Sequence, residues 1–202
     1  MGRGWVVSRK TGGMLSGAAR SSPATDADVG AHWRTPPDLA EAINVAFEID
    51  PWALDLAATR ESSLAPEYFG PDHEDPERRD MLGLRLTIGD LYGSGAGRFP
   101  GPVWCNPPYS RQGIDRWMQL CAKLGRPDRP VVALVFARTD CAWFHERALP
   151  DAEQILLIKG RVSFLHPSDG KPRAPAGAPS MAILWRRPPA AGSPWVRGLS
   201  WR

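Results

Sequence analysis

The sequence predicts a three-layer α/β protein, in which helices cover both faces of a mainly parallel sheet. Short apolar runs that are typical of strands alternate with segments whose apolar residues have helical spacing. The run "VVALVF" at residues 131–136 is apolar throughout, as expected of a strand that is covered on both faces. The chain has 202 residues, which is enough for one domain with a sizeable core.

The first predicted helix lies within "TPPDLAEAINVAF", residues 35–47. Thr35 is a candidate N-cap, and Pro36 suits the first helical position. Leu39, Ile43 and Phe47 then share one face of the helix. The other elements are predicted in this order: strands at 53–58 and 102–105, an amphipathic helix at 113–124, a strand at 131–136, a short helix at 140–149, and strands at 153–160 and 180–186.

The two ends of the chain differ in composition from its middle. Residues 1–30 are rich in Gly, Ser, Ala and Arg and show little periodicity, which predicts a disordered basic arm. Residues 188–202 form a Pro-rich basic tail. We expect this tail to be mobile, with Trp195 and Trp201 docking on the domain. The folded domain is therefore expected to span residues 31–187.

The composition excludes several classes of protein. No apolar run approaches the ~20 residues of a membrane span, and the polar start is unlike a secretory signal. Cys105, Cys121 and Cys141 are too widely spaced for a zinc motif, and the histidines show no ligand spacing. We therefore expect a cytoplasmic protein with reduced thiols, no metal ion and no membrane. The sequence does not fix the oligomeric state, and we expect a monomer.

The most informative stretch is "VWCNPPYSRQGIDRW", residues 103–117, where two prolines follow a strand and an asparagine. Ligands of open α/β sheets bind beyond the carboxyl ends of the strands. The side-chain carbonyl of Asn106 and the main-chain carbonyl of Pro107 offer two acceptors for a planar NH₂ group. Tyr109 is placed to stack on the ring that carries the amine. The simpler alternative is a turn that is stiffened by proline.

These residues and their context resemble a known family. "NPPY" is similar to the catalytic motif of amino-group methyltransferases that use S-adenosylmethionine. The opening "HWRTPPDLAEAINVAFEIDPWALDLAAT" resembles that of the Dam-like DNA adenine methyltransferases of phages and prophages. Later segments of the same family are matched, in the same order, by "PEYF", "LVFARTDCAWFHE", "ILLIKGRVSF" and "APSMAILW". The resemblance covers about residues 31–186.

The resemblance implies a Rossmann-like methyltransferase fold with a C-terminal antiparallel hairpin strand. It implies methyl transfer from S-adenosylmethionine to the exocyclic N6 amine of adenine in double-stranded DNA. The catalytic residues would be Asn106, Pro107, Pro108 and Tyr109. Such an enzyme flips the base out of the duplex, at a cost of a few kcal/mol, and Tyr109 would stack on it.

The resemblance also assigns residues to the methyl donor. Trp33, Thr35 and Pro36 match the entry motif, which lies near the methionine part of the donor. Asp55 matches the acidic residue near the donor amine, although it could instead cap the end of a strand. The Gly-x-Gly turn of most such enzymes is missing after this strand, so Ala57 is the candidate contact there.

Two further acidic residues are candidates for the nucleoside part of the donor. In nucleotide-binding folds, an acidic residue about 20 residues after the first strand holds ribose hydroxyls. Asp72 follows the Asp55 strand at a similar distance. It could equally belong to a solvated charged loop. Asp90 could accept a hydrogen bond from the adenine amine of the donor, or it could cap a turn.

Four cations follow predicted strand ends on the side of the Asn-Pro-Pro-Tyr motif. They are Arg111, Arg138, Lys159 and Arg161, and we expect them to contact phosphates of the nucleic acid. The alternative is ordinary surface solvation. The formal net charge of +3 and the pI of about 9.0 permit a nucleic-acid partner without requiring one.

The activity itself has alternatives. A planar amine or amide could also be that of cytosine, of RNA or of a protein glutamine, although glutamine enzymes carry a glycine-rich donor loop that this chain lacks. A hypothesis of a different functional class is that the protein binds nucleic acid as a catalytically inactive relative of these enzymes. The recognition sequence cannot be read, and the loops at residues 71–87 and 166–179 are the candidates for base recognition.

Overall fold

The computed structural model describes residues 33–83, 99, 101–108, 113–166, 169–186 and 193–201. The predicted basic arm, residues 1–30, lies outside these described residues. So do three of the candidate site residues, Asp90, Tyr109 and Arg111. Their assignments stay predictions.

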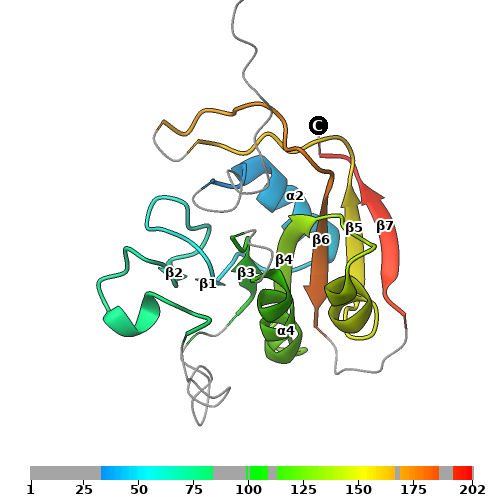
Figure 1. Cartoon of the computed structure of the whole chain (residues 1–202), viewed down its shortest axis with the longest axis horizontal. Helices are drawn as coiled ribbons and strands as arrows, with labels where there is room; N and C mark the ends of the chain where they lie inside the picture. The colour runs from blue at the N-terminus through cyan, green and yellow to red at the C-terminus, as the bar shows by residue number, and fades with distance from the viewer. Residues whose placement is uncertain are drawn as a thin grey trace, which may run out of the picture.

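The described residues form one seven-stranded sheet with the order β2-β1-β3-β4-β6-β5-β7 (Figure 1). The strands β2, β1, β3 and β4 run parallel to one another, whereas β6 is antiparallel to both β4 and β5. The sheet is therefore mainly parallel with an antiparallel strand near the carboxyl end, as predicted. The strands are β1 (Leu54–Asp55), β2 (Glu67–Tyr68), β3 (Val103–Cys105), β4 (Val131–Phe136), β5 (Gln154–Ile158), β6 (Ser180–Trp185) and β7 (Trp195–Leu199).

Helices cover the two faces of this sheet, which confirms the three layers. The helix α2 (Pro37–Phe47) packs on one face, where its apolar stripe meets alternate residues of β4 such as Val132 and Leu134. The helix α4 (Ile114–Leu124) and the π-helical turn η2 (Phe144–Ala148) pack on the other face, against Val131 and Ala133. A short 3₁₀ helix, η1 (Pro76–Arg78), follows β2. Because β4 is buried on both faces, its sequence is apolar throughout.

The start of α2 differs from the prediction. The helix begins at Pro37, Pro36 is its N-cap, and no side chain caps it. Pro36 has a ψ of 128° because the ring of Pro37 excludes the helical conformation from the preceding residue. Thr35 therefore lies outside the helix, and its hydroxyl is available for another partner.

The predicted mobile tail contains a strand. β7 pairs in parallel with β5 at the end of the sheet, from Gln154↔Trp195 to Ile158↔Leu199. Trp201 packs against the core on the α2 side, as expected of a docked side chain, whereas the side chain of Trp195 is 76% exposed. The strand has only five residues and follows a proline-rich stretch, so the sequence of the tail did not indicate it.

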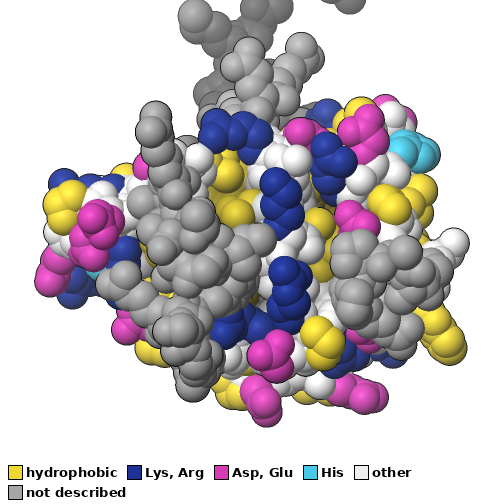
Figure 2. All heavy atoms as spheres, turned by 90° about the horizontal axis from the view of Figure 1, so that it is seen from below, with side chains coloured by type: hydrophobic (Ala, Val, Ile, Leu, Met, Phe, Trp, Pro, Cys, Tyr) yellow, Lys and Arg dark blue, Asp and Glu magenta, His cyan; other side chains and the backbone are white. Residues whose placement is uncertain are grey.

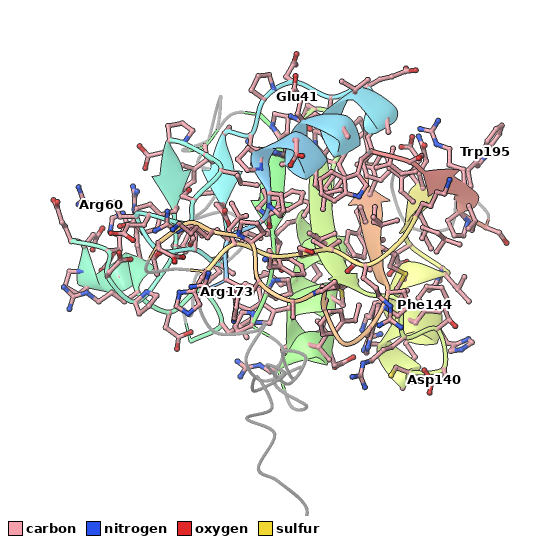
Figure 3. The ribbon with its side chains drawn as sticks, turned by 90° about the horizontal axis from the view of Figure 1, so that it is seen from above. Glu41, Arg60, Asp140, Phe144, Arg173 and Trp195 are labelled. Carbon is pink, nitrogen blue, oxygen red and sulfur yellow. The ribbon has the colours of Figure 1, made fainter. Side chains whose placement is uncertain are left out.

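The topology brings the ends of several strands to one edge of the sheet. β1, β3 and β4 are mutually parallel, and β5 shares their direction because both β4 and β5 run antiparallel to β6. Figure 3 looks onto this edge from above, where the segment joining β5 to β6 crosses toward the segment that carries Arg60. Arg173 lies on the crossing part. None of the helices in the described ranges is both long and apolar enough to cross a membrane.

Candidate active site

A cavity of about 190 Å³ lies where β1 and β3 end. Its walls come from the segments that leave β1, β2, η1 and β3, together with one residue before α2 and one on α4. The lining residues are Trp33, Leu56, Ala57, Ala58, Thr59, Ser62, Phe69, Gly70, Pro71, Arg79, Asp80, Met81, Asn106, Pro108 and Trp117. This is the carboxyl edge of parallel strands, where ligands bind in open α/β sheets.

Asn106 lies in the wall of this cavity, directly after β3. Its Nδ2 donates a hydrogen bond to Thr35 Oγ1 at 3.3 Å. Its Oδ1 is shielded from solvent and has no hydrogen-bond partner within the described residues. A buried acceptor without a partner is costly, so it indicates a position where a ligand donor completes the hydrogen bonding.

The two prolines that follow have different environments. Pro107 is buried, whereas Pro108 is exposed and lines the cavity. Since a proline has no N–H, neither residue can donate to the sheet at this point, and the chain must leave β3. The proline pair thus holds Asn106 at the end of the strand. Tyr109, the last residue of the predicted motif, lies outside the described residues.

The predicted entry motif meets Asn106 in space. Trp33 lines the cavity, and its ring contacts that of His166 edge-to-face with the centroids 5.1 Å apart. Thr35 is only 4% exposed and accepts the hydrogen bond from Asn106. Pro36 is buried, and its carbonyl accepts hydrogen bonds from the first turn of α2. Segments that lie 71 residues apart in the sequence therefore converge here.

Asp55 is buried behind the cavity and is not among the residues that line it. One of its carboxylate oxygens accepts from the N–H of Ala57 at 3.2 Å, and the other accepts from the N–H of Leu64 at 3.3 Å. Burial raises the pKa of Asp55 to about 7, while these two N–H groups act in the opposite direction. Asp55 therefore anchors both ends of the loop after β1, and contact with the donor amine stays a prediction.

The loop after β1 uses its own backbone donors internally. The N–H of Ala57 bonds Asp55, and the N–H of Ala58 bonds the carbonyl of Phe69 at 2.9 Å. Ala57 does line the cavity, as its assignment as a donor contact requires. A ligand at this wall would meet the alanine methyl groups and the hydroxyls of Thr59 and Ser62.

Among the acidic residues, the structure favours one that the sequence analysis did not select. Asp72 is exposed and does not line the cavity, and its Oδ2 accepts from the N–H of Arg60 at 3.0 Å. Asp80, eight residues later, does line the cavity, as does the neighbouring Arg79. No sequence signal separates these acids, because the fold of the charged loop decides which one reaches the wall. Asp90 lies outside the described residues.

The cysteine beside the motif is not placed to act as a nucleophile. Cys105 is fully buried between the sheet and α4. Burial, and then the neighbouring thiol of Cys121, raises the pKa of the Cys105 thiol. A protonated, inaccessible thiol has no role in covalent catalysis.

Three of the four predicted phosphate contacts lie in the described residues. Arg138 and Lys159 are exposed and follow β4 and β5 on the edge that carries Asn106. Arg161 is also exposed, and its guanidinium donates to the carbonyl of Ala176 at 3.3 Å, within the segment that crosses the edge. Arg111 lies outside the described residues.

Charge alone does not identify a nucleic-acid face. Figure 2 shows the molecule from below, on the side away from the cavity edge, and Lys and Arg side chains gather across the middle of that face too. The case for phosphate contacts rests on proximity to the cavity. Within the described residues, no group of three or more His, Cys, Asp or Glu side chains could hold a metal ion.

Comparison with known proteins identifies the family. The model of the family described as DNA N-6-adenine-methyltransferase (Dam) matches residues 22–192, which include β1 to β6 and every residue that lines the cavity. Among curated proteins, none matches the chain. The family match covers most of the 202 residues, from before the entry motif to just before β7. The chain belongs to the DNA N-6-adenine-methyltransferase (Dam) family.

Proposed function

We propose that the protein transfers a methyl group from S-adenosylmethionine to the exocyclic N6 amine of adenine in double-stranded DNA. The observation that carries the proposal is the Asn106 amide, which lines the cavity with a shielded Oδ1 that lacks a partner in the described part of the chain. An exocyclic amine supplies the donor that this acceptor needs. The family membership makes adenine the first substrate to test. Action on DNA would take place in the cytoplasm.

The donor set of the cavity fits S-adenosylmethionine. Phe69, Met81 and the alanines after β1 offer apolar surface for a flat adenine ring. The carboxylate of Asp80 and the hydroxyls of Thr59 and Ser62 suit the ribose hydroxyls. Arg79 offers a cation for the carboxylate of the donor. We expect Trp33, Thr35 and Pro36 on the side of the methionine part, and Asp55 near the amine.

The protein's part in the reaction is to hold and polarise the substrate amine. When bound, S-adenosylmethionine supplies an electrophilic methyl group on a positively charged sulfur. The carbonyl oxygens of Asn106 and Pro107 would each accept one N–H of the amine. As the nitrogen lone pair leaves conjugation with the ring and forms the new bond, positive charge develops on these hydrogens. Fixed acceptors stabilise that charge without having to reorganise.

The cations at the same edge suit a duplex from which the base has been flipped. Lys159 follows β5, three strand positions from β3, or about 15 Å at about 4.8 Å for each strand. This separation suits contact with phosphates that flank the flipped nucleotide. Arg138 and Arg161 would add to the same phosphate surface, and Tyr109 would stack on the base.

The direct test is incubation of the purified protein with methyl-labelled S-adenosylmethionine and duplex DNA, followed by nucleoside analysis. We expect N6-methyladenine. Methylated cytosine alone, or label only in RNA or protein, would replace adenine by one of the other planar substrates. No transfer to any of them, with intact DNA binding, would indicate an inactive nucleic-acid-binding relative.

The matched variant is Asn106→Ala. Loss of one preorganised polar group costs roughly 10²-fold in turnover. The affinity for the donor should change little, because Asn106 is expected to face the substrate amine. Equal turnover of variant and wild type would remove Asn106 from catalysis. The same assay on Ser193→Ala, an exposed hydroxyl before β7 at the opposite edge of the sheet, controls for a general effect of substitution.

A further inference from the structure

The segment before α2 is fixed on both sides of Thr35. On one side, the N–H of Arg34 donates to the carbonyl of Leu165 at 3.0 Å, and the N–H of Leu165 donates back at 2.9 Å. On the other side, Pro36 caps α2, and its carbonyl accepts from Leu39 and Ala40 at 3.1 Å. The hydroxyl of Thr35 is therefore a fixed point, and its β-branched side chain has few rotamers.

The amide of Asn106 has two chemically different ends. Nδ2 carries two hydrogens and can only donate, whereas Oδ1 can only accept. A rotation of half a turn about the last side-chain bond exchanges them with almost no change in shape. In that reversed state, the NH₂ group would face the NH₂ of the substrate, and the two donors would repel each other.

The structure has the productive orientation. Nδ2 donates to Thr35 Oγ1 at 3.3 Å, and Oδ1 is left without a partner among the described residues. We infer that Thr35 is a positioning residue, whose hydroxyl anchors the Nδ2 end of the Asn106 amide and so holds Asn106 Oδ1 where it is free to accept from the substrate amine. This rests on the proposed function, and it gives Thr35 a role toward the substrate in place of one toward the donor.

The hydroxyl, and not the volume, of Thr35 carries this role. Thr35→Val keeps the shape and removes this hydrogen bond, so the Asn106 amide should lose its anchor and become more mobile. The worth of one neutral hydrogen bond corresponds to about a five- to tenfold fall in kcat. The affinity for the donor should stay within about twofold. Thr35→Ser retains the hydroxyl and should recover most of kcat.

Activity is measured at limiting and at saturating donor, with donor affinity from calorimetry and thermal unfolding recorded for each variant. Ser193→Ala, which removes an exposed hydroxyl before β7 at the opposite edge of the sheet, is the control and should behave as wild type. A Thr35→Val protein with wild-type kcat would overturn the inference. So would a loss that saturating donor restores, because Thr35 would then bind the donor. An equal loss in Thr35→Ser would show a packing role.

A second measurement needs neither turnover nor a stable Thr35→Val protein. The side-chain NH₂ resonances of Asn106 are assigned in the wild type by their absence in Asn106→Ala. A hydrogen-bonded, buried Nδ2 should give slowly exchanging protons, and Thr35→Ser should preserve them. Fast exchange in the wild type would refute the hydrogen bond. Absence of methyl transfer by the wild type would refute the proposed function instead, and would leave this result standing.

Discussion

The pKa of Asp55 predicts a pH dependence of stability that one substitution should remove. Burial raises the pKa of this carboxyl from 3.8 to about 7 in the folded protein. The folded state therefore holds its proton to higher pH than the unfolded chain does. As pH rises from about 4 to 7, the unfolded state gains an ionised Asp55 and the folded state does not, so the free energy of unfolding falls.

The magnitude follows from the two pKa values. At about 1.36 kcal/mol for each pKa unit, the difference between 3.8 and about 7 amounts to about 4 kcal/mol above pH 7. Less than half of this loss is present at pH 5, and nearly all of it is present at pH 8. The free energy of unfolding should therefore lose roughly 2 to 3 kcal/mol between pH 5 and 8 through Asp55 alone.

Asp55→Asn removes the titration and keeps the shape. The amide retains an oxygen for one of the N–H groups of Ala57 and Leu64, and the other N–H loses its acceptor. That loss costs about 1–3 kcal/mol at every pH. The test is therefore the change with pH of the difference between variant and wild type, and not the difference at any one pH.

The assay is urea unfolding of both proteins at several pH values from 5 to 8. The variant should gain roughly 2 to 3 kcal/mol relative to wild type over this range. The control is Asp50→Asn, at an exposed carboxylate before β1. Its free energy of unfolding should change with pH nearly as that of the wild type does. Parallel curves for Asp55→Asn would refute the reasoning. Parallel curves would mean that Asp55 is already ionised in the folded protein over this range.

Two further predictions concern ligands. If Asp55 lies near the donor amine, the positive charge of the amine should lower the pKa of this carboxyl. Donor binding near pH 7 should then release protons, and calorimetry in buffers of different ionisation heat measures this release. No release from wild type, or an equal release from Asp55→Asn, would confine Asp55 to anchoring the loop. Replacing Lys159 and Arg161 with Ala should weaken DNA binding for all sequences and reduce the salt slope by about 0.9 per lost phosphate contact. The control is Lys123→Ala, in the last turn of α4. An unchanged salt slope in the double variant would argue against the phosphate role.

The sequence predicted β1 and the strands from β3 to β6, and it missed β2 and β7. β4 and β6 are six residues long and buried throughout, and β5 has five residues, so each leaves a clear apolar signal. β2 has two residues, of which one is exposed and one buried. Such a pair carries no periodicity, and it becomes a strand only because the preceding loop returns it beside β1.

The site was predictable where topology alone decides position. Asn106 follows a parallel strand, so its place at the ligand edge follows from the direction of β3. The contact between Thr35 and Asn106 was not predicted, because no local pattern links residues this far apart. The sequence analysis chose Asp72 as the donor contact, whereas Asp80 lines the cavity. Both lie in one charged loop, and only the folded path of that loop decides which of them reaches the cavity wall.

The absent glycine turn after β1 has a physical explanation in the neighbouring strand. A glycine in such a turn lets two stretches of backbone approach each other closely. Here the close approach occurs between the carbonyl of Ala58 and Gly70, which follows β2. A Cβ at Gly70 would lie only 1.5 Å from the Ala58 oxygen, so no other residue fits without moving the backbone. Ala57 and Ala58 fit after β1, where Asp55 and Phe69 accept hydrogen bonds from their N–H groups. The residue that must be glycine is Gly70, in the adjacent wall of the same cavity.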